Sequence, residues 1–98
     1  MKAYLVANVS VGDPEAYAVY RAEVPAVIAR YGGRYLIRAG EVERLEGELP
    51  LDRFVVIEFP SREAARRFYD SPEYAPLLAI RSGSASSSVA IVHGYENA

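Results

Sequence analysis

The chain has 98 residues, 51% of them apolar and 24% charged, a balance typical of one folded globular domain. It has no cysteine, which excludes disulfides, thiolate metal sites and thiol catalysis. The net charge of −2 and the single histidine give no basic excess for binding nucleic acid. No apolar run reaches the length of a membrane span, and the start lacks the apolar block of a signal peptide. We therefore expect a cytoplasmic protein with one domain over residues 1–98 and a tail from about residue 95.

The first part of the chain predicts a strand and a long helix. Residues 3–9 are short, apolar and β-prone, with both faces of the strand largely apolar. A strand of this kind is expected to be covered on both sides. Asp13 and Pro14 then suit the N-cap and the first position of a helix. The helix is expected to kink at Pro25, where the ring removes a hydrogen-bond donor, and to end at residues 32–33.

The middle of the chain predicts two further strands. Residues 34–39 form the first, and Gly40 marks a bulge or a bend. Two alternatives stay open, because the strand either ends there or continues over residues 41–46. Residues 47–52 are expected to form a turn, and residues 53–59 a third strand.

The last part of the chain predicts two helices and a strand. Ser61 is a suitable N-cap for the first helix, and the residues 70–72 interrupt it. A second, short helix is expected to have Ser71 as its cap and Pro72 at its first position. Residues 82–88 are small and polar and predict a loop, followed by a last strand over residues 89–93.

The order β-α-β-β-α-β is that of a ferredoxin-like α+β fold with an antiparallel sheet in the strand order 4-1-3-2. The two helical segments cover one face of such a sheet. The other face is also apolar here, and an exposed apolar face usually marks an interaction site. We therefore expect a homodimer in which two sheets pack against each other.

A series of short motifs, taken together and in order, resembles a known family. The motifs are Asp13–Tyr17 with Tyr20 and Arg21, Tyr31–Leu36 with Arg38, Gly40–Val42, Asp52–Arg53, Ile57–Pro60 and Phe68–Tyr74. They resemble the family called domain of unknown function 1330. The resemblance implies a ferredoxin-like fold that pairs into a dimeric α/β barrel, in small bacterial cytosolic proteins, and it implies no reaction. Related barrel dimers include cofactor-free monooxygenases and small isomerases, which is an analogy of fold alone.

The most unusual charged residue is Glu58, which stands within the third strand between two apolar residues. Burying a carboxylate is costly unless it is paired, and Arg34 and Arg38 lie on the neighbouring strand, where we expect them to share a face. If the hairpin pairs directly, Arg34 opposes Glu58. The charges form either a structural ion pair or a site, with Glu58 as general base and Arg38 as anion binder.

Four further residues are candidates for binding a ligand. Asn8 lies at the end of the first strand, where it either makes an ordinary hydrogen bond or orients a ligand. Tyr20 and Tyr74 are placed to line a cleft between the helices and the sheet. His93, the one histidine of the sequence, ends the last strand and is either a base or an exposed or hydrogen-bonded terminal residue.

The function expected from these residues is that of a small-molecule binding protein or a cofactor-free enzyme, with its pocket inside or beside the barrel. The candidate catalytic residues are Glu58 and Arg38, and the candidate ligand-binding residues are Asn8, Tyr20, Arg34, Tyr74 and His93. We expect no metal, no cofactor, no nucleic acid and no membrane as partners. The alternative is a non-catalytic binding or regulatory dimer whose polar strand residues are structural.

Overall fold

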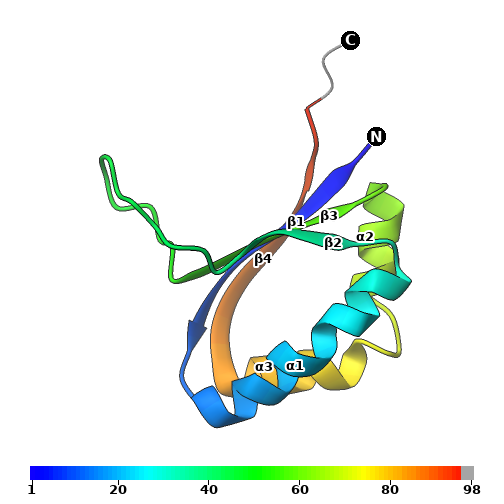
Figure 1. The fold of residues 1–98 in the computed structure, drawn as a ribbon. Helices are drawn as coiled ribbons and strands as arrows, with labels where there is room; N and C mark the ends of the chain where they lie inside the picture. Colours follow the sequence, from blue (N-terminus) through cyan, green and yellow to red (C-terminus); the bar gives the residue numbers. More distant parts are fainter. Residues whose placement is uncertain (96–98) are drawn as a thin grey trace.

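The computed structural model describes residues 1–95, which fold into a layer of helices packed on one face of a sheet (Figure 1). The elements are β1 (Ala3–Val11), α1 (Pro14–Arg30), β2 (Arg34–Arg38), β3 (Arg53–Phe59), α2 (Arg62–Tyr69), α3 (Ala75–Ser84) and β4 (Ala85–His93). The four strands form one antiparallel sheet in the order β2-β3-β1-β4. The predicted ferredoxin-like fold and strand order are confirmed. The predicted tail beyond residue 95 lies outside the described residues.

The long helix α1 begins and ends where the sequence predicts. Asp13 accepts a hydrogen bond from the backbone N–H of Ala16 at 3.3 Å, which satisfies one of the free donors of the first turn. The helix continues through Pro25 as a single element. It ends before Gly33, where a Cβ atom would approach Ile28 and Phe59 to 2.7 Å. Glycine at this position therefore lets the end of α1 pack closely against β3.

The strand β2 contains a bulge that the sequence does not reveal. Arg34 is opposite Glu58, but Arg38 is opposite Val55, because the register shifts between Tyr35 and Ile37. Side chains alternate along β3, so its residues 58 and 55 face opposite sides of the sheet. The prediction that Arg34 and Arg38 share a face is therefore wrong. Of the two alternatives for the end of this strand, the continuation over residues 41–46 is also wrong, because β2 ends at Arg38.

The prediction of a loop over residues 82–88 is wrong, because α3 continues to Ser84 and β4 begins at Ala85. Ser84 holds this junction in place: its hydroxyl donates to the carbonyl of Ile80 at 2.6 Å. Its own carbonyl accepts from the backbone N–H groups of Gly12 and Asp13, both at 2.9 Å. Residues 86–88 then pair with β1 through their backbones. Backbone partners in β1 and in residues 12–13, together with the Ser84 hydroxyl, therefore determine the structure of this segment.

The start of the last helix also differs from the prediction. Ser71 does cap a turn, since its hydroxyl accepts from the backbone N–H of Tyr74 at 3.1 Å and donates to the carbonyl of Phe68 at 2.8 Å. That turn precedes the helix, which begins at Ala75. Pro72 is therefore not the first helical residue.

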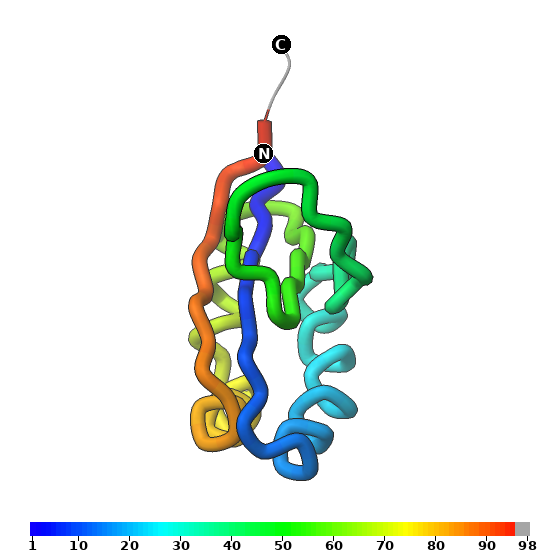
Figure 2. The backbone as a smooth tube through the Cα atoms, turned by 90° about the vertical axis from the view of Figure 1, so that its left-hand side faces the viewer, coloured from blue at the N-terminus to red at the C-terminus, as the bar shows by residue number. Residues whose placement is uncertain are grey.

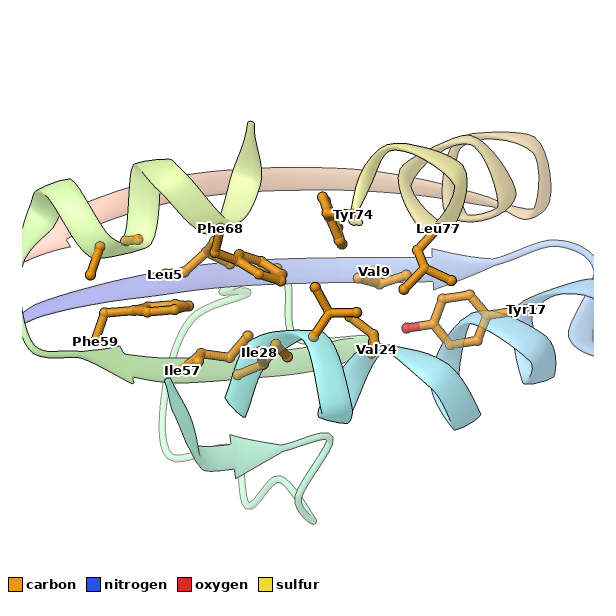
Figure 3. Close-up of a cluster of buried hydrophobic side chains, with 14 residues drawn as sticks. Leu5, Val9, Tyr17, Val24, Ile28, Ile57, Phe59, Phe68, Tyr74 and Leu77 are labelled. Atoms are coloured by element: carbon orange, nitrogen blue, oxygen red, sulfur yellow. The ribbon is translucent and has the colours of Figure 1, made fainter. Parts of the chain in front are cut away.

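The hydrophobic core lies between the inner face of the sheet and the helices (Figure 3). Leu5 of β1 and Ile57 of β3 face Ile28 of α1 across this space. Phe59 and Phe68 are fully buried, and their ring centroids lie 5.5 Å apart. None of the helices within residues 1–95 is long and apolar enough to cross a membrane.

No helix of residues 1–95 lies on the outer face of the sheet, as Figure 2 shows from that side. The β2–β3 arm (residues 39–52) projects from this side (Figures 1 and 2). The side chains of Leu45 and Leu49 in the arm are 88% and 65% exposed. The outer face and the arm thus leave apolar groups uncovered in the single chain.

Candidate functional site

The hydrophobic layer contains a cleft whose wall combines apolar side chains with several polar ones. It lies between the sheet and the helices α1 and α3, where four tyrosines and four arginines approach one another. The lining residues that carry polar groups are Tyr17, Tyr20 and Arg21 of α1, Tyr35 and Arg38 of β2, Arg53 of β3, Tyr74 before α3, and Arg81 within it. Leu5, Ala7, Val9, Val24, Val55, Ile57 and Val89 complete the wall. Figure 3 shows Tyr17 and Tyr74 extending into the space between the sheet and the helices, one from α1 and the other from the turn before α3.

The deepest polar groups form a short chain of hydrogen bonds. The hydroxyls of Tyr20 and Tyr74 lie 2.9 Å apart, and Nε of Arg81 donates to the hydroxyl of Tyr74 at 3.3 Å. Tyr74 and Arg81 are only 3% and 6% exposed. Ring packing positions Tyr74, because its centroid lies 4.5 Å from that of Phe68. The hydroxyl end of Tyr74 therefore rests on the core and faces the arginine.

Two tyrosines of the cleft, Tyr20 and Tyr35, have a raised pKa and stay protonated at physiological pH. Burial raises the pKa of Tyr20, and the neighbouring hydroxyl of Tyr74 raises it further. Burial also raises the pKa of Tyr35, although Arg38 opposes this shift. A protonated phenol donates a hydrogen bond, so these groups and the guanidinium groups together present donors to the cleft.

Two more arginines of the cleft lie over aromatic rings. The guanidinium of Arg38 lies 4.8 Å from the ring centroid of Tyr35, and its Nη2 donates to the backbone carbonyl of Arg21 at 2.6 Å. This bond crosses from β2 to α1 and closes the mouth. Arg53 lies 5.4 Å from the ring centroid of Tyr17, and its buried Nε has no hydrogen-bond partner.

Three of the predicted site residues meet in this cleft, namely Tyr20, Tyr74 and Arg38. Glu58 and Arg34 do not, because they lie together on the outer face. There Nε of Arg34 contacts Oε1 of Glu58 at 2.9 Å, and Nζ of Lys2 contacts the same oxygen at 3.5 Å. Arg34 is thus opposite Glu58, as expected if the hairpin pairs directly. The side chain of Glu58 is 12% exposed.

The other two predicted residues lie apart from the cleft. The side-chain carbonyl of Asn8 accepts from the backbone N–H of Asp52 at 2.8 Å, and its amide donates to the Asp52 carboxylate at 3.3 Å. Asn8 therefore fastens the base of the β2–β3 arm to β1. His93 is exposed at the end of β4, beside Met1 and Ser61 in a shallow hollow.

The sequence reasoning missed the arginines that matter most in the cleft, Arg53 and Arg81. One signal pointed to Arg81, because it shares a helical face with Tyr74 and Leu77 and so interrupts an apolar stripe. A charged residue on a buried stripe is unusual unless something pairs with it. Arg53 belongs to the family motif Asp52–Arg53, but that motif assigns it no role, and a residue that opens a strand is interpreted as an ordinary surface residue.

Glu58→Gln is expected to lower the stability of the protein at pH 7 and to have no effect in acid. The hydrogen bond from Arg34 lowers the pKa of Glu58, while burial opposes the shift. A carboxylate whose pKa is lowered on folding stabilises the native state above its unfolded pKa of about 4.3, and this contribution is lost as the pH falls through the folded pKa. Urea denaturation of both proteins across this pH range measures the difference.

The exposed pair Arg66–Asp70, one turn apart on α2, offers a matched control. Asp70→Asn is expected to change stability little at either pH, because exposed ion pairs contribute little. Equal losses for the two variants, or a loss for Glu58→Gln that persists in acid, would contradict an ion-pair role for Glu58.

The fold and the cleft define a class of protein, a ferredoxin-like α+β domain with a polar cavity beneath its helices. The chain belongs to the family described as "Domain of unknown function (DUF1330)", whose model matches residues 2–95. The family resemblance of its motifs is thereby confirmed. No curated protein matches this chain.

Several solved structures have the same fold. A protein of unknown function from Rhodopseudomonas palustris, RPA0582, is 20% identical, with a TM-score of 0.78 over 98% of this chain and 84% of that one. SnoaB, a cofactor-independent oxygenase from Streptomyces nogalater, is 19% identical, with a TM-score of 0.65 over 98% and 95% of the two chains. Rv0793 from Mycobacterium tuberculosis is 20% identical, with a TM-score of 0.59 over 100% and 99%. Because these proteins are only 19–20% identical to this chain, the similarity shows a common fold alone.

Proposed function

We propose that this protein binds a small organic molecule in the cleft between the sheet and the helices α1 and α3. The supporting observation is the cluster of hydroxyl and guanidinium groups within a layer that is otherwise apolar. Ligand sites are typically apolar cavities with a few placed polar groups that fix orientation. The hydrogen-bonded group of Tyr20, Tyr74 and Arg81 against the apolar wall fits that description.

The cleft must open to admit a ligand of organic size. Its free volume is about 40 Å³, whereas ligand sites usually hold roughly 300–1,000 Å³. Arg38 is exposed and spans the mouth through one hydrogen bond to the carbonyl of Arg21. Rotation of this side chain toward solvent widens the mouth without disturbing the core. We therefore retain Arg38 in the proposed site, as a residue that contacts the ligand.

Binding is favoured over acid–base catalysis by the composition of the cleft. Among the described residues that line it, none is a carboxylate or a histidine, and burial keeps Tyr20 protonated. A cofactor-free reaction in this cleft would need the substrate to supply its own base. Glu58, which the sequence suggested as a general base, lies on the outer face and has no part in this proposal.

Tyr20→Phe is expected to weaken ligand binding about tenfold, because one hydrogen bond in a closed site contributes roughly 1–1.5 kcal/mol. Ligands would first be found by a thermal-shift screen of small acids, quinones and phenols. A compound at 100 times its Kd stabilises the native state by about 2.7 kcal/mol. Calorimetric titration of wild type and variant then gives the two Kd values.

Tyr95→Phe is the matched control, since Tyr95 is 90% exposed and is not one of the residues that line the cleft. It is expected to bind as wild type does. If no compound raises the melting temperature, or if Tyr20→Phe and Tyr95→Phe bind a compound equally well, the cleft is not the binding site.

We also propose that the outer face of the sheet forms a homodimer. One row of side chains crosses all four strands, because Ile37 pairs with Val56, Val56 with Val6, and Val6 with Ala90. This row is apolar throughout, and Ile37 is 41% exposed in the single chain. A second copy seated on this face would also meet the apolar β2–β3 arm, which projects from the same side. The cytoplasmic location stays a prediction from the sequence.

A further inference from the structure

The most informative group in the cleft is the guanidinium of Arg81. It is 6% exposed, and the hydroxyl of Tyr74 is the one hydrogen-bond acceptor that the described residues offer it. No carboxylate of residues 1–95 lies within ion-pair distance of it. Arginine stays charged in proteins, and a buried charge without a counter-charge costs several kcal/mol. The cleft therefore holds a cation that no side chain of residues 1–95 compensates.

The other arginines of the cleft add to this positive charge. The buried Nε of Arg53 lacks a partner, and the guanidinium of Arg38 rests on a ring and a backbone carbonyl. No acidic residue is present among the described lining residues, although the chain has 13 acids and 11 bases overall. Outside the cleft, Arg34 and Arg66 are paired with carboxylates. Acids are thus available to this protein but absent from the cleft.

We propose that the ligand is a small aromatic carboxylate, with its charged group on Arg81 and its ring among the tyrosines. This inference rests on the proposed binding function and adds the chemical class of the ligand. A planar guanidinium matches a carboxylate with paired hydrogen bonds. The hydroxyls of Tyr20 and Tyr74 supply further donors to the anion, and the rings of Tyr17 and Tyr35 offer surfaces for an aromatic ring.

The first measurement needs no ligand. Arg81→Met keeps an apolar side chain of similar reach and removes the buried charge. If Arg81 serves an anionic ligand, the variant without ligand is expected to melt at or above the wild-type temperature, because the uncompensated cation is gone. Arg66→Met, which changes an exposed arginine on α2, is the control for loss of an arginine. A melting temperature for Arg81→Met well below those of both other proteins would assign Arg81 a structural role and overturn the inference.

The second measurement compares acids with their neutral amides. Benzoate and benzamide, and 2-naphthoate and 2-naphthamide, have nearly the same shape and differ in charge. Wild type and Arg66→Met are expected to bind the acid of at least one pair tenfold or more tightly than its amide. Arg81→Met is expected to bring the two Kd values within about threefold, and Arg81→Lys to restore part of the preference.

The remaining outcomes separate the inference from the proposed function. If wild type binds the amides as tightly as the acids, or binds only other neutral compounds of the screen, the charge assignment is overturned while small-molecule binding stands. If sodium phosphate alone raises the melting temperature as much as benzoate does, and this requires Arg81, the ligand is an inorganic anion and the aromatic part is overturned. If wild type binds neither acids, amides nor any screened compound, both proposals fail.

Discussion

Val56→Glu is expected to convert the proposed homodimer into a folded monomer. Val56 lies at the centre of the apolar row on the outer face, opposite Val6 on one side and Ile37 on the other. In a dimer this position is covered both by neighbouring residues of its own sheet and by the second copy. An unpaired carboxylate there is strongly unfavourable. In a monomer the same side chain faces water, so the fold itself tolerates the charge.

Size-exclusion chromatography with light scattering measures the result. Wild type at tens of micromolar is expected to have twice the chain mass of 10.8 kDa, and Val56→Glu to have that mass once. Val56→Thr is the matched control, because it keeps the shape and the β-branch without adding charge. A monomeric wild type would end the dimer proposal. A variant that stays dimeric would place the interface on another surface.

Phe68→Ala is expected to lower the free energy of unfolding by about 3–5 kcal/mol, the range for removing a buried phenylalanine. The ring is 2% exposed and packs against three others, those of Tyr31, Phe59 and Tyr74. These partners come from the end of α1, from β3 and from the turn before α3, which are all fixed in position by their backbones. The cavity left by the ring therefore closes only in part, and urea denaturation measures the cost.

The exposed neighbour Arg67 gives a control on the same helix. Arg67→Ala is expected to change the free energy of unfolding by no more than about 0.5 kcal/mol, as surface substitutions usually do. A loss below about 1 kcal/mol for Phe68→Ala would show that the aromatic cluster does not hold α2 and the turn before α3 to the sheet. The position of Tyr74 in the cleft would then need another explanation.

The sequence predicted the fold because its strongest signals are local. The cap at Asp13, the glycines after α1, and the apolar strand over residues 53–59 each define an element without reference to the rest of the chain. The segment 82–88 failed for the opposite reason. Its serines favour neither helix nor strand, and its structure depends on backbone partners in β1 and in the loop that follows it.

The candidate site was predictable only in part, because its parts come from both layers. Tyr20 and Tyr74 could be assigned to a cleft from their helical spacing. Arg53 could not, since the unpartnered state of its Nε depends on the packing of α1 over β3. The outward and inward arginines of β2 could not be told apart either, because that distinction depends on one bulged residue.

The bulge at Leu36 also limits how β2 can be compared between proteins. It shifts the alternation of the strand by one residue, so that Arg34 serves the outer face and Arg38 the inner one. In a relative whose β2 lacks this extra residue, the position aligned with Arg38 faces away from the cleft. A role for Arg38 can therefore be assigned to the aligned residue of another protein only if the side chains of its β2 alternate in the same way. An identical residue at the aligned position is not sufficient.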